Sequence, residues 1–195
     1  MEPARTIHNG HPASDIAGIE TPCAIGGHAA ALMLYARVAG LPSDYVELYL
    51  SDFVELYAAE MDRIPQASRR TPDFRTGCEV MRHAVFAVEE PRLQGHFACL
   101  LAAASDARRG ADVHPAFASI LSGLASGEAD VLLAMSAASA RPSSSQADSP
   151  ASALCNLRRL GLVEPASSGA EGAPALSALG RRFVAACLEP AISQA

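Results

Sequence analysis

The chain has 195 residues and a formal net charge of −6; half of its residues are hydrophobic, 5% are aromatic and Trp is absent. A chain of this length can form one domain with a sizeable hydrophobic core, or one such domain with a small second unit. Residues 1–138 carry ten Arg against seventeen Asp and Glu, whereas residues 139–195 carry five Arg against four acids. An acidic body lacks the clustered cations by which proteins bind nucleic acid or anionic membranes, so both functions are disfavoured for residues 1–138.

The cysteines and the N-terminal segments indicate a cytoplasmic protein. The five cysteines are widely spaced, and no pair of them follows the C-x-x-C pattern, which favours reduced thiols. Residues 1–10 lack the basic start and apolar core of a secretory signal. Residues 22–41 are mostly apolar, but His28 and Arg37 interrupt them, so a core helix is favoured over a membrane span.

Apolar residues at helical spacing predict a mainly α-helical body over residues 22–138, after a loose polar arm at residues 1–21. A first helix is expected over residues 24–39. Ser43 is a suitable N-cap for a second, long helix that ends near Arg63. The predicted buried stripe of the second helix consists of Val46, Tyr49, Leu50, Phe53, Leu56, Tyr57 and Met61. Its remaining positions include the acids Glu47, Asp52, Glu55, Glu60 and Asp62.

These acids permit two interpretations. The favoured one is the solvated face of an amphipathic surface helix. The alternative is an acidic docking surface for a basic partner.

Four further helices complete the predicted body. A third carries Phe74, Cys78, Met81, Val85 and Val88 on one stripe, and a fourth starts at Pro91, a residue that suits the first helical position. The buried stripe of the fourth helix is expected to be Leu93, Phe97, Leu100, Leu101 and Ala104. His114-Pro115 starts a fifth helix, and Ser126 is the expected cap of a sixth that ends near Ala138.

Residues 139–150 are rich in Ser and Pro and are the clearest linker in the chain. Residues 151–190 then predict a helix closed by Gly161, a short hairpin with a Ser/Gly-rich loop at 165–172, and a last helix capped by Ser177. This order is that of the closing half of a winged-helix unit. The predicted fold is therefore a helical bundle followed by a small winged-helix-like C-terminal unit.

Catalytic patterns are nearly absent. The six histidines show no metal-binding spacing, no nucleophile motif is present, and no cofactor fingerprint occurs, so neither a metal nor a cofactor is expected. Arg109 lies five positions before His114, which resembles the R-x4-6-H signature of HEPN ribonucleases. In that hypothesis the histidine serves as general acid or base while the arginine stabilises the phosphate.

His114 has a second interpretation, which we favour. Its ring can cap the fifth helix or bridge a helix junction, with Pro115 at the first helical position and Phe117 as an apolar anchor.

The winged-helix interpretation supplies a different function. The helix from Ala151 to Leu160 would present Asn156, Arg158 and Arg159 to a DNA groove, and the loop at 165–172 would be the wing. The wing region, however, carries Glu164 and Glu171 and no cation, and the helix offers only two charges. Winged helices also mediate protein contacts, because a fold does not fix a function.

Several segments together resemble one known family. They are residues 97–103, the Val113–Ala118 element, the Leu-rich turn that leads to Glu128, and the pair Asn156–Leu162 and Leu176–Gly180. In this order and spacing, over about residues 30–190, they resemble the abortive-infection alpha family of bacterial proteins. The resemblance implies a link to phage defence and supplies no catalytic residues.

The sequence thus predicts a non-enzymatic, cytoplasmic, defence-associated protein that acts through a protein partner or as a homo-oligomer. The alternatives are a DNA-binding regulator that uses the C-terminal unit and a HEPN-like ribonuclease that uses Arg109 and His114. Contact with a membrane is disfavoured.

Overall fold

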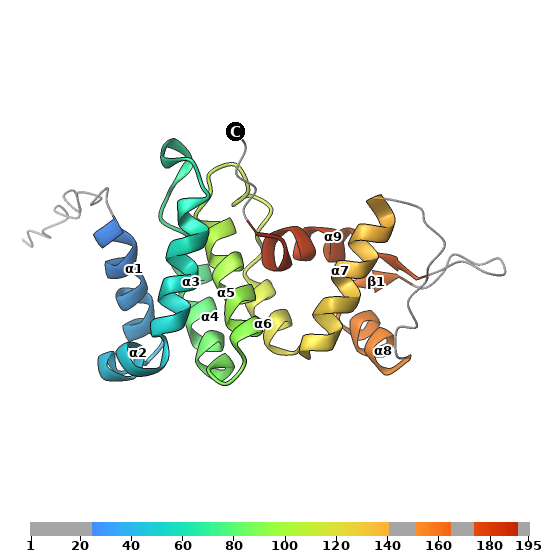
Figure 1. The fold of residues 1–195 in the computed structure, drawn as a ribbon, viewed down its shortest axis with the longest axis horizontal. Helices are drawn as coiled ribbons and strands as arrows, with labels where there is room; N and C mark the ends of the chain where they lie inside the picture. Colours follow the sequence, from blue (N-terminus) through green and yellow to red (C-terminus); the bar gives the residue numbers. More distant parts are fainter. Residues whose placement is uncertain (1–24, 141–150, 165–173, 191–195) are drawn as a thin grey trace, which may run out of the picture.

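The computed structural model describes residues 25–140, 151–164 and 174–190, and these form a mainly helical protein (Figure 1). The predicted arm at 1–21, most of the linker and the loop at 165–172 lie outside the described residues. In the first part of the chain the helices are α1 (Ile25–Val38), α2 (Ser43–Tyr49), α3 (Ser51–Asp62), η1 (Gln66–Ser68), α4 (Phe74–Ala84), η2 (Val85–Ala87) and α5 (Pro91–Ala104). The rest comprises α6 (Ala116–Ser122), α7 (Ser126–Ala140), α8 (Ala151–Arg159), β1 (Val163–Glu164), β2 (Ala175–Leu176), α9 (Ala178–Phe183) and the π-helical turn η3 (Val184–Leu188).

The buried centre of the molecule is α5, which packs against α3, α4, α6 and η3. Four of its five predicted stripe residues are buried, and Leu93 is half-buried. As predicted, Pro91 occupies the start of the helix, where its missing N–H costs no hydrogen bond. The C-terminal end of α5 is joined to α3, because the hydroxyl of Tyr57 in α3 lies 2.8 Å from the hydroxyl of buried Ser105.

The predicted long second helix is divided in two. Leu50 leaves the helical region with φ −112° and ψ 13°, and its fully buried side chain marks the corner between α2 and α3. Because of this break, α2 and α3 do not share the single buried face that one long helix would have. Tyr49 and Leu56, expected inside, are therefore 51% and 37% exposed. The acid Glu60, expected outside, is buried beside Arg63, to which it is paired.

Two of the predicted helix starts differ from the structure. Ser43 lies inside α2, whose N-cap is Pro42, and Ser126 lies inside α7. The first turn of α7 is instead tied down by Glu128, whose carboxylate accepts the N–H of Ala125 at 2.9 Å. Phe74 is likewise 52% exposed rather than buried, since it opens α4 and meets the ring of Tyr35 edge-on.

The C-terminal segment is a helix, a hairpin and a helix. Gly161, with φ +74°, ends α8 as predicted, and Val163 pairs with Leu176 in the two-stranded antiparallel sheet. Ser177 caps α9 by accepting the N–H of Gly180 at 2.8 Å. In Figure 1, α9 runs roughly horizontally between α5 and α7, and η3 packs on both of these helices. One hydrophobic core therefore runs from α1 to η3.

Within the described ranges, no single helix is long and apolar enough to span a membrane. Ala116–Ser122 and Ser126–Ala137 reach that length and apolarity only when taken together, and the two are bent by 117°.

Candidate functional site

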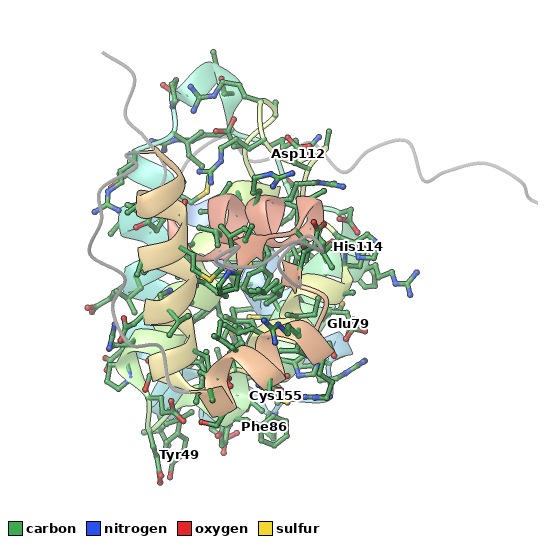
Figure 2. The ribbon with its side chains drawn as sticks, turned by 90° about the vertical axis from the view of Figure 1, so that its right-hand side faces the viewer. Tyr49, Glu79, Phe86, Asp112, His114 and Cys155 are labelled. Carbon is green, nitrogen blue, oxygen red and sulfur yellow. The ribbon has the colours of Figure 1, made fainter. Side chains whose placement is uncertain are left out.

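A pocket of about 320 Å³ opens between α4 and the start of α6. Its polar lining residues are Arg75 and Glu79 of α4, His114 before α6 and Ser119 within it. Arg75 and Glu79 stand four residues apart and so share one face of α4. In Figure 2, His114 and Glu79 lie on the same side of the molecule. We call this hollow the α4–α6 pocket.

The local sequence explains how the pocket is built. Asp73 starts α4 by accepting the N–H of Thr76 at 3.0 Å, which fixes where Arg75 and Glu79 project. Glu79 then accepts a hydrogen bond from Arg82 at 2.9 Å and lies 3.8 Å from Nε2 of His83. Residues of the same helix therefore orient the carboxylate of Glu79 and partly neutralise its charge.

His114, Pro115 and Phe117 begin α6 and fix it in place. The Nδ1 atom of His114 accepts the N–H of Ala116 at 3.1 Å, and Pro115 is the N-cap residue. Phe117 is fully buried and meets Phe183 of α9 edge-on, with ring centroids 5.4 Å apart. The same arrangement leaves Nε2 of the His114 ring as the nitrogen that carries the proton in the neutral form.

Arg109 is not part of the α4–α6 pocket. Its guanidinium donates to the backbone carbonyl of Ala185 in η3. Its neighbour Arg108 is engaged as well, because Nη2 lies 2.7 Å from a carboxylate oxygen of fully buried Asp106. Burial alone would raise the pKa of Asp106, but the hydrogen bonds from Arg108 outweigh it and hold this pKa below its usual value. The cation that accompanies His114 in the pocket is Arg75, not Arg109.

The three residues of α8 that the DNA-binding hypothesis uses differ in their contacts. Asn156 donates to both carboxylate oxygens of Glu128, at 2.9 and 2.8 Å, so it joins α8 to α7. Arg159 donates to the side-chain oxygen of Asn156 at 2.8 Å. Arg158 is exposed, and its guanidinium makes no hydrogen bond or ion pair within the described residues.

A second exposed feature lies at another end of the molecule. Leu48, Tyr49 and Phe86 are 73%, 51% and 81% exposed, and Figure 2 shows Tyr49 and Phe86 at the same end. Tyr45 connects them, because its ring lies 4.7 Å from that of Tyr49 and its hydroxyl donates to the carbonyl of Val85 at 3.4 Å. We call Tyr45, Leu48, Tyr49 and Phe86 the aromatic patch.

Three residues of the aromatic patch, Tyr45, Leu48 and Tyr49, lie on the acidic helix α2, and Phe86 lies on η2. Residues 43–62 contain six acids and no base. The exposed acids Asp44, Glu47, Asp52 and Glu55 have no ion-pair partner among the described residues. Uncompensated negative charge therefore lies on α2, which carries Leu48 and Tyr49, and on the adjoining helix α3.

The comparisons with known proteins identify a family. The model of the family described as abortive infection alpha matches residues 46–187. The chain belongs to the abortive infection alpha family. Neither a curated protein nor a solved structure matches it.

The region shared with the abortive infection alpha family runs from the middle of α2 to η3. It contains the entire α4–α6 pocket and, from the aromatic patch, Leu48, Tyr49 and Phe86. Within the described residues of this family member, no three His, Cys, Asp or Glu side chains gather closely enough to hold a metal ion.

Sequence reasoning alone did not find Arg75, Glu79 and Ser119. Arg75 and Glu79 show a helical i, i+4 spacing, but that spacing is common on solvated faces. What joins them to His114 is the packing of α4 on α6, which brings together residues about 35 positions apart. The aromatic patch was missed for a similar reason, since the break at Leu50 turns Tyr49 outward.

Proposed function

We propose that this protein acts in abortive infection by binding another protein, without catalysis, through the aromatic patch and the acids beside it. The observation that carries the proposal is the exposure of Leu48, Tyr49 and Phe86 on helices with no basic residue. Exposed groups of large apolar side chains are typical of interaction sites, and aromatic residues are enriched there. The family supplies the biological setting.

The charge of this surface indicates the chemistry of its partner. A symmetric dimer through the aromatic patch would bring Asp44, Glu47 and Asp52 of one copy against the same acids of the other. Such like-charge contact is unfavourable. The partner is therefore a different protein surface, one that carries Arg or Lys beside apolar side chains.

The test is a phage-challenge growth curve of bacteria that express the chain or its variants. We expect the wild type to protect the culture and Tyr49→Ser/Phe86→Ser to abolish protection at equal soluble expression. Reversal of charge in Asp44→Lys/Glu47→Lys should do the same, because it removes the complementarity with a basic partner.

Leu34→Ser is the matched control for these variants. Leu34 is 52% exposed, like Tyr49, but it lies on α1 and outside the matched family region. It should leave protection intact. Full protection by both patch variants would refute the proposed docking surface.

A second candidate function rests on the C-terminal segment. We propose that α8, the β1–β2 hairpin and α9 form a winged-helix-like unit, because α8 carries arginines in its last turn and leads directly into an antiparallel hairpin. Duplex DNA would then bind through Arg158, the arginine of α8 with no recorded partner within the described part of the chain. Fluorescence anisotropy at about 50 and about 200 mM salt tests this, since Arg158→Gln should reduce the salt slope by about 1.

The ribonuclease hypothesis gains no comparable observation. Arg109 is engaged with Ala185 and does not line the pocket at His114. It retains a direct test, which is the loss of RNA cleavage in His114→Ala with unchanged melting behaviour.

A further inference from the structure

The α4–α6 pocket has a combination of side chains that the proposed docking surface does not use. Arg75, His114 and Ser119 come from two elements and present three different hydrogen-bond donors to one hollow. Its volume of about 320 Å³ falls at the small end of the range for ligand pockets, roughly 300–1,000 Å³.

The donors of the pocket are available to a ligand. Arg75 is exposed and has no recorded ion pair or hydrogen bond with the described residues, so its guanidinium retains its planar set of donors. His114 uses Nδ1 as an acceptor for the start of α6, which leaves Nε2–H as a donor in the neutral ring. The hydroxyl of Ser119 is a third donor.

Three donors favour a phosphoryl group over a carboxylate. A terminal phosphoryl group offers three oxygens, and arginine recognises phosphate through paired N–H bonds. A carboxylate has two oxygens and a single negative charge, so three donors from separate positions match the three oxygens and the larger charge of a phosphoryl group better.

Glu79 determines what accompanies the phosphoryl group. Its charge is partly neutralised by Arg82 at 2.9 Å, yet a carboxylate has about four acceptor positions and keeps some of them open. A carboxylate facing a phosphate is unfavourable, so Glu79 requires a hydrogen-bond donor on the ligand, such as a sugar hydroxyl.

From this geometry we propose that the α4–α6 pocket binds a small phosphorylated sugar, of the size of a pentose phosphate or a mononucleotide. Arg75, His114 and Ser119 hold the phosphoryl group, and Glu79 accepts a hydrogen bond from a hydroxyl of the sugar. The site is independent of the aromatic patch, so either proposal can fail alone.

Isothermal titration calorimetry of the full chain tests the proposal, with ribose 5-phosphate as the probe. We expect saturable one-to-one binding, no binding of ribose, and at least a tenfold loss of affinity in Arg75→Gln. Glu79→Gln should weaken binding of ribose 5-phosphate but not of inorganic phosphate, because only the sugar hydroxyl contacts Glu79. Arg37→Gln, at an exposed arginine of α1 that does not line the pocket, is the matched control and should bind like the wild type.

Three results would overturn the proposal. They are no binding of ribose 5-phosphate or AMP up to about 5 mM, unchanged affinity in folded Arg75→Gln, and equal affinity for ribonate, which carries a carboxylate in place of the phosphoryl group. Circular dichroism establishes that each variant is folded. If Arg75→Gln does not fold, Ser119→Ala replaces it and should also weaken binding of the phosphorylated probe.

Discussion

Gly180 of α9 lies directly against the backbone of Leu162. A Cβ atom at this position would collide with the carbonyl oxygen of Leu162, which already accepts the N–H of Ser177 at 3.0 Å and cannot rotate away. We expect Gly180→Ala to lower the free energy of unfolding by about 1–3 kcal/mol. Urea denaturation followed by circular dichroism measures this change.

Gly95 provides the control for that substitution. It lies inside α5, and apart from its chain neighbours and the backbone of its own helix no atom stands within 4 Å of the position that its Cβ would take. Gly95→Ala should therefore stabilise the protein by about 0.5–1 kcal/mol. If Gly180→Ala were as stable as Gly95→Ala, the close approach of α9 to Leu162 would be refuted.

His96 makes stability depend on pH. Burial lowers its pKa, and the charge of Arg92 lowers it further, against the opposing effects of Asp130 and the Cys187 backbone. Since the pKa is lower in the folded than in the unfolded protein, the unfolded chain binds the proton more readily. The stability that comes from neutral His96 is thus complete above the ordinary pKa of 6.5 and is lost as the pH falls through that value toward the folded pKa.

Urea denaturation at about pH 7.5 and about pH 5.5 tests this prediction. The wild type should lose more free energy of unfolding between the two pH values than His96→Gln, which cannot take up the proton. Equal losses in the two proteins would show that His96 titrates alike in both states.

At the scale of elements, the junction of α7 and α8 depends on one carboxylate with two roles. Glu128 accepts the N–H of Ala125 at the start of α7 and, through its two oxygens, hydrogen bonds from the side-chain amide of Asn156 in α8. Asn156→Asp would place a second negative charge beside Glu128. We expect it to reduce the free energy of unfolding by about 1–3 kcal/mol, the cost of a lost hydrogen bond to a charged group.

A double-mutant cycle with Glu128→Gln isolates this contact. The penalty of Asn156→Asp should shrink when residue 128 is neutral, because the like-charge repulsion is gone. An unchanged penalty would mean that α8 does not depend on this contact and that Asn156 is free to serve another role.

The elements also show how far local sequence rules reach. Gly161, Ser177 and Pro91 act as predicted, because the end or start of a helix is decided by the backbone preference of one residue. The break at Leu50 has no such signal, since no Gly or Pro stands there. It arises from the burial of Leu50 at the corner of α2 and α3, which depends on tertiary packing.

The same distinction applies to the candidate site. The capping contact of His114 is local, with a partner two residues away, and therefore could be anticipated. The α4–α6 pocket, by contrast, could be predicted only from the knowledge that α4 packs on α6. A single sequence gives periodicity but not the pairing of helices, so Arg75 and Glu79 could not be assigned to His114 in advance.

At the scale of the whole molecule, the question is whether the body at 22–138 and the unit at 151–190 fold together. Phe183 of α9 is fully buried and contacts Phe117 of α6, and η3 covers α5. The hydrophobic core is thus shared across the sequence boundary. We therefore expect Phe183→Ala to cost about 3–5 kcal/mol and to destabilise both parts in one transition.

The tyrosines make this prediction measurable. All four lie in α1, α2 and α3, far along the chain from α9, and Trp is absent. Tyrosine fluorescence therefore reports only the N-terminal helices. If the molecule unfolds as one unit, Phe183→Ala shifts the tyrosine transition as far as the transition seen by circular dichroism. Phe86→Ala, the same change at an 81% exposed position, should shift neither. A tyrosine transition that is unaffected by Phe183→Ala would instead mean that the C-terminal unit unfolds alone, and the boundary in the sequence would then also be a boundary in folding.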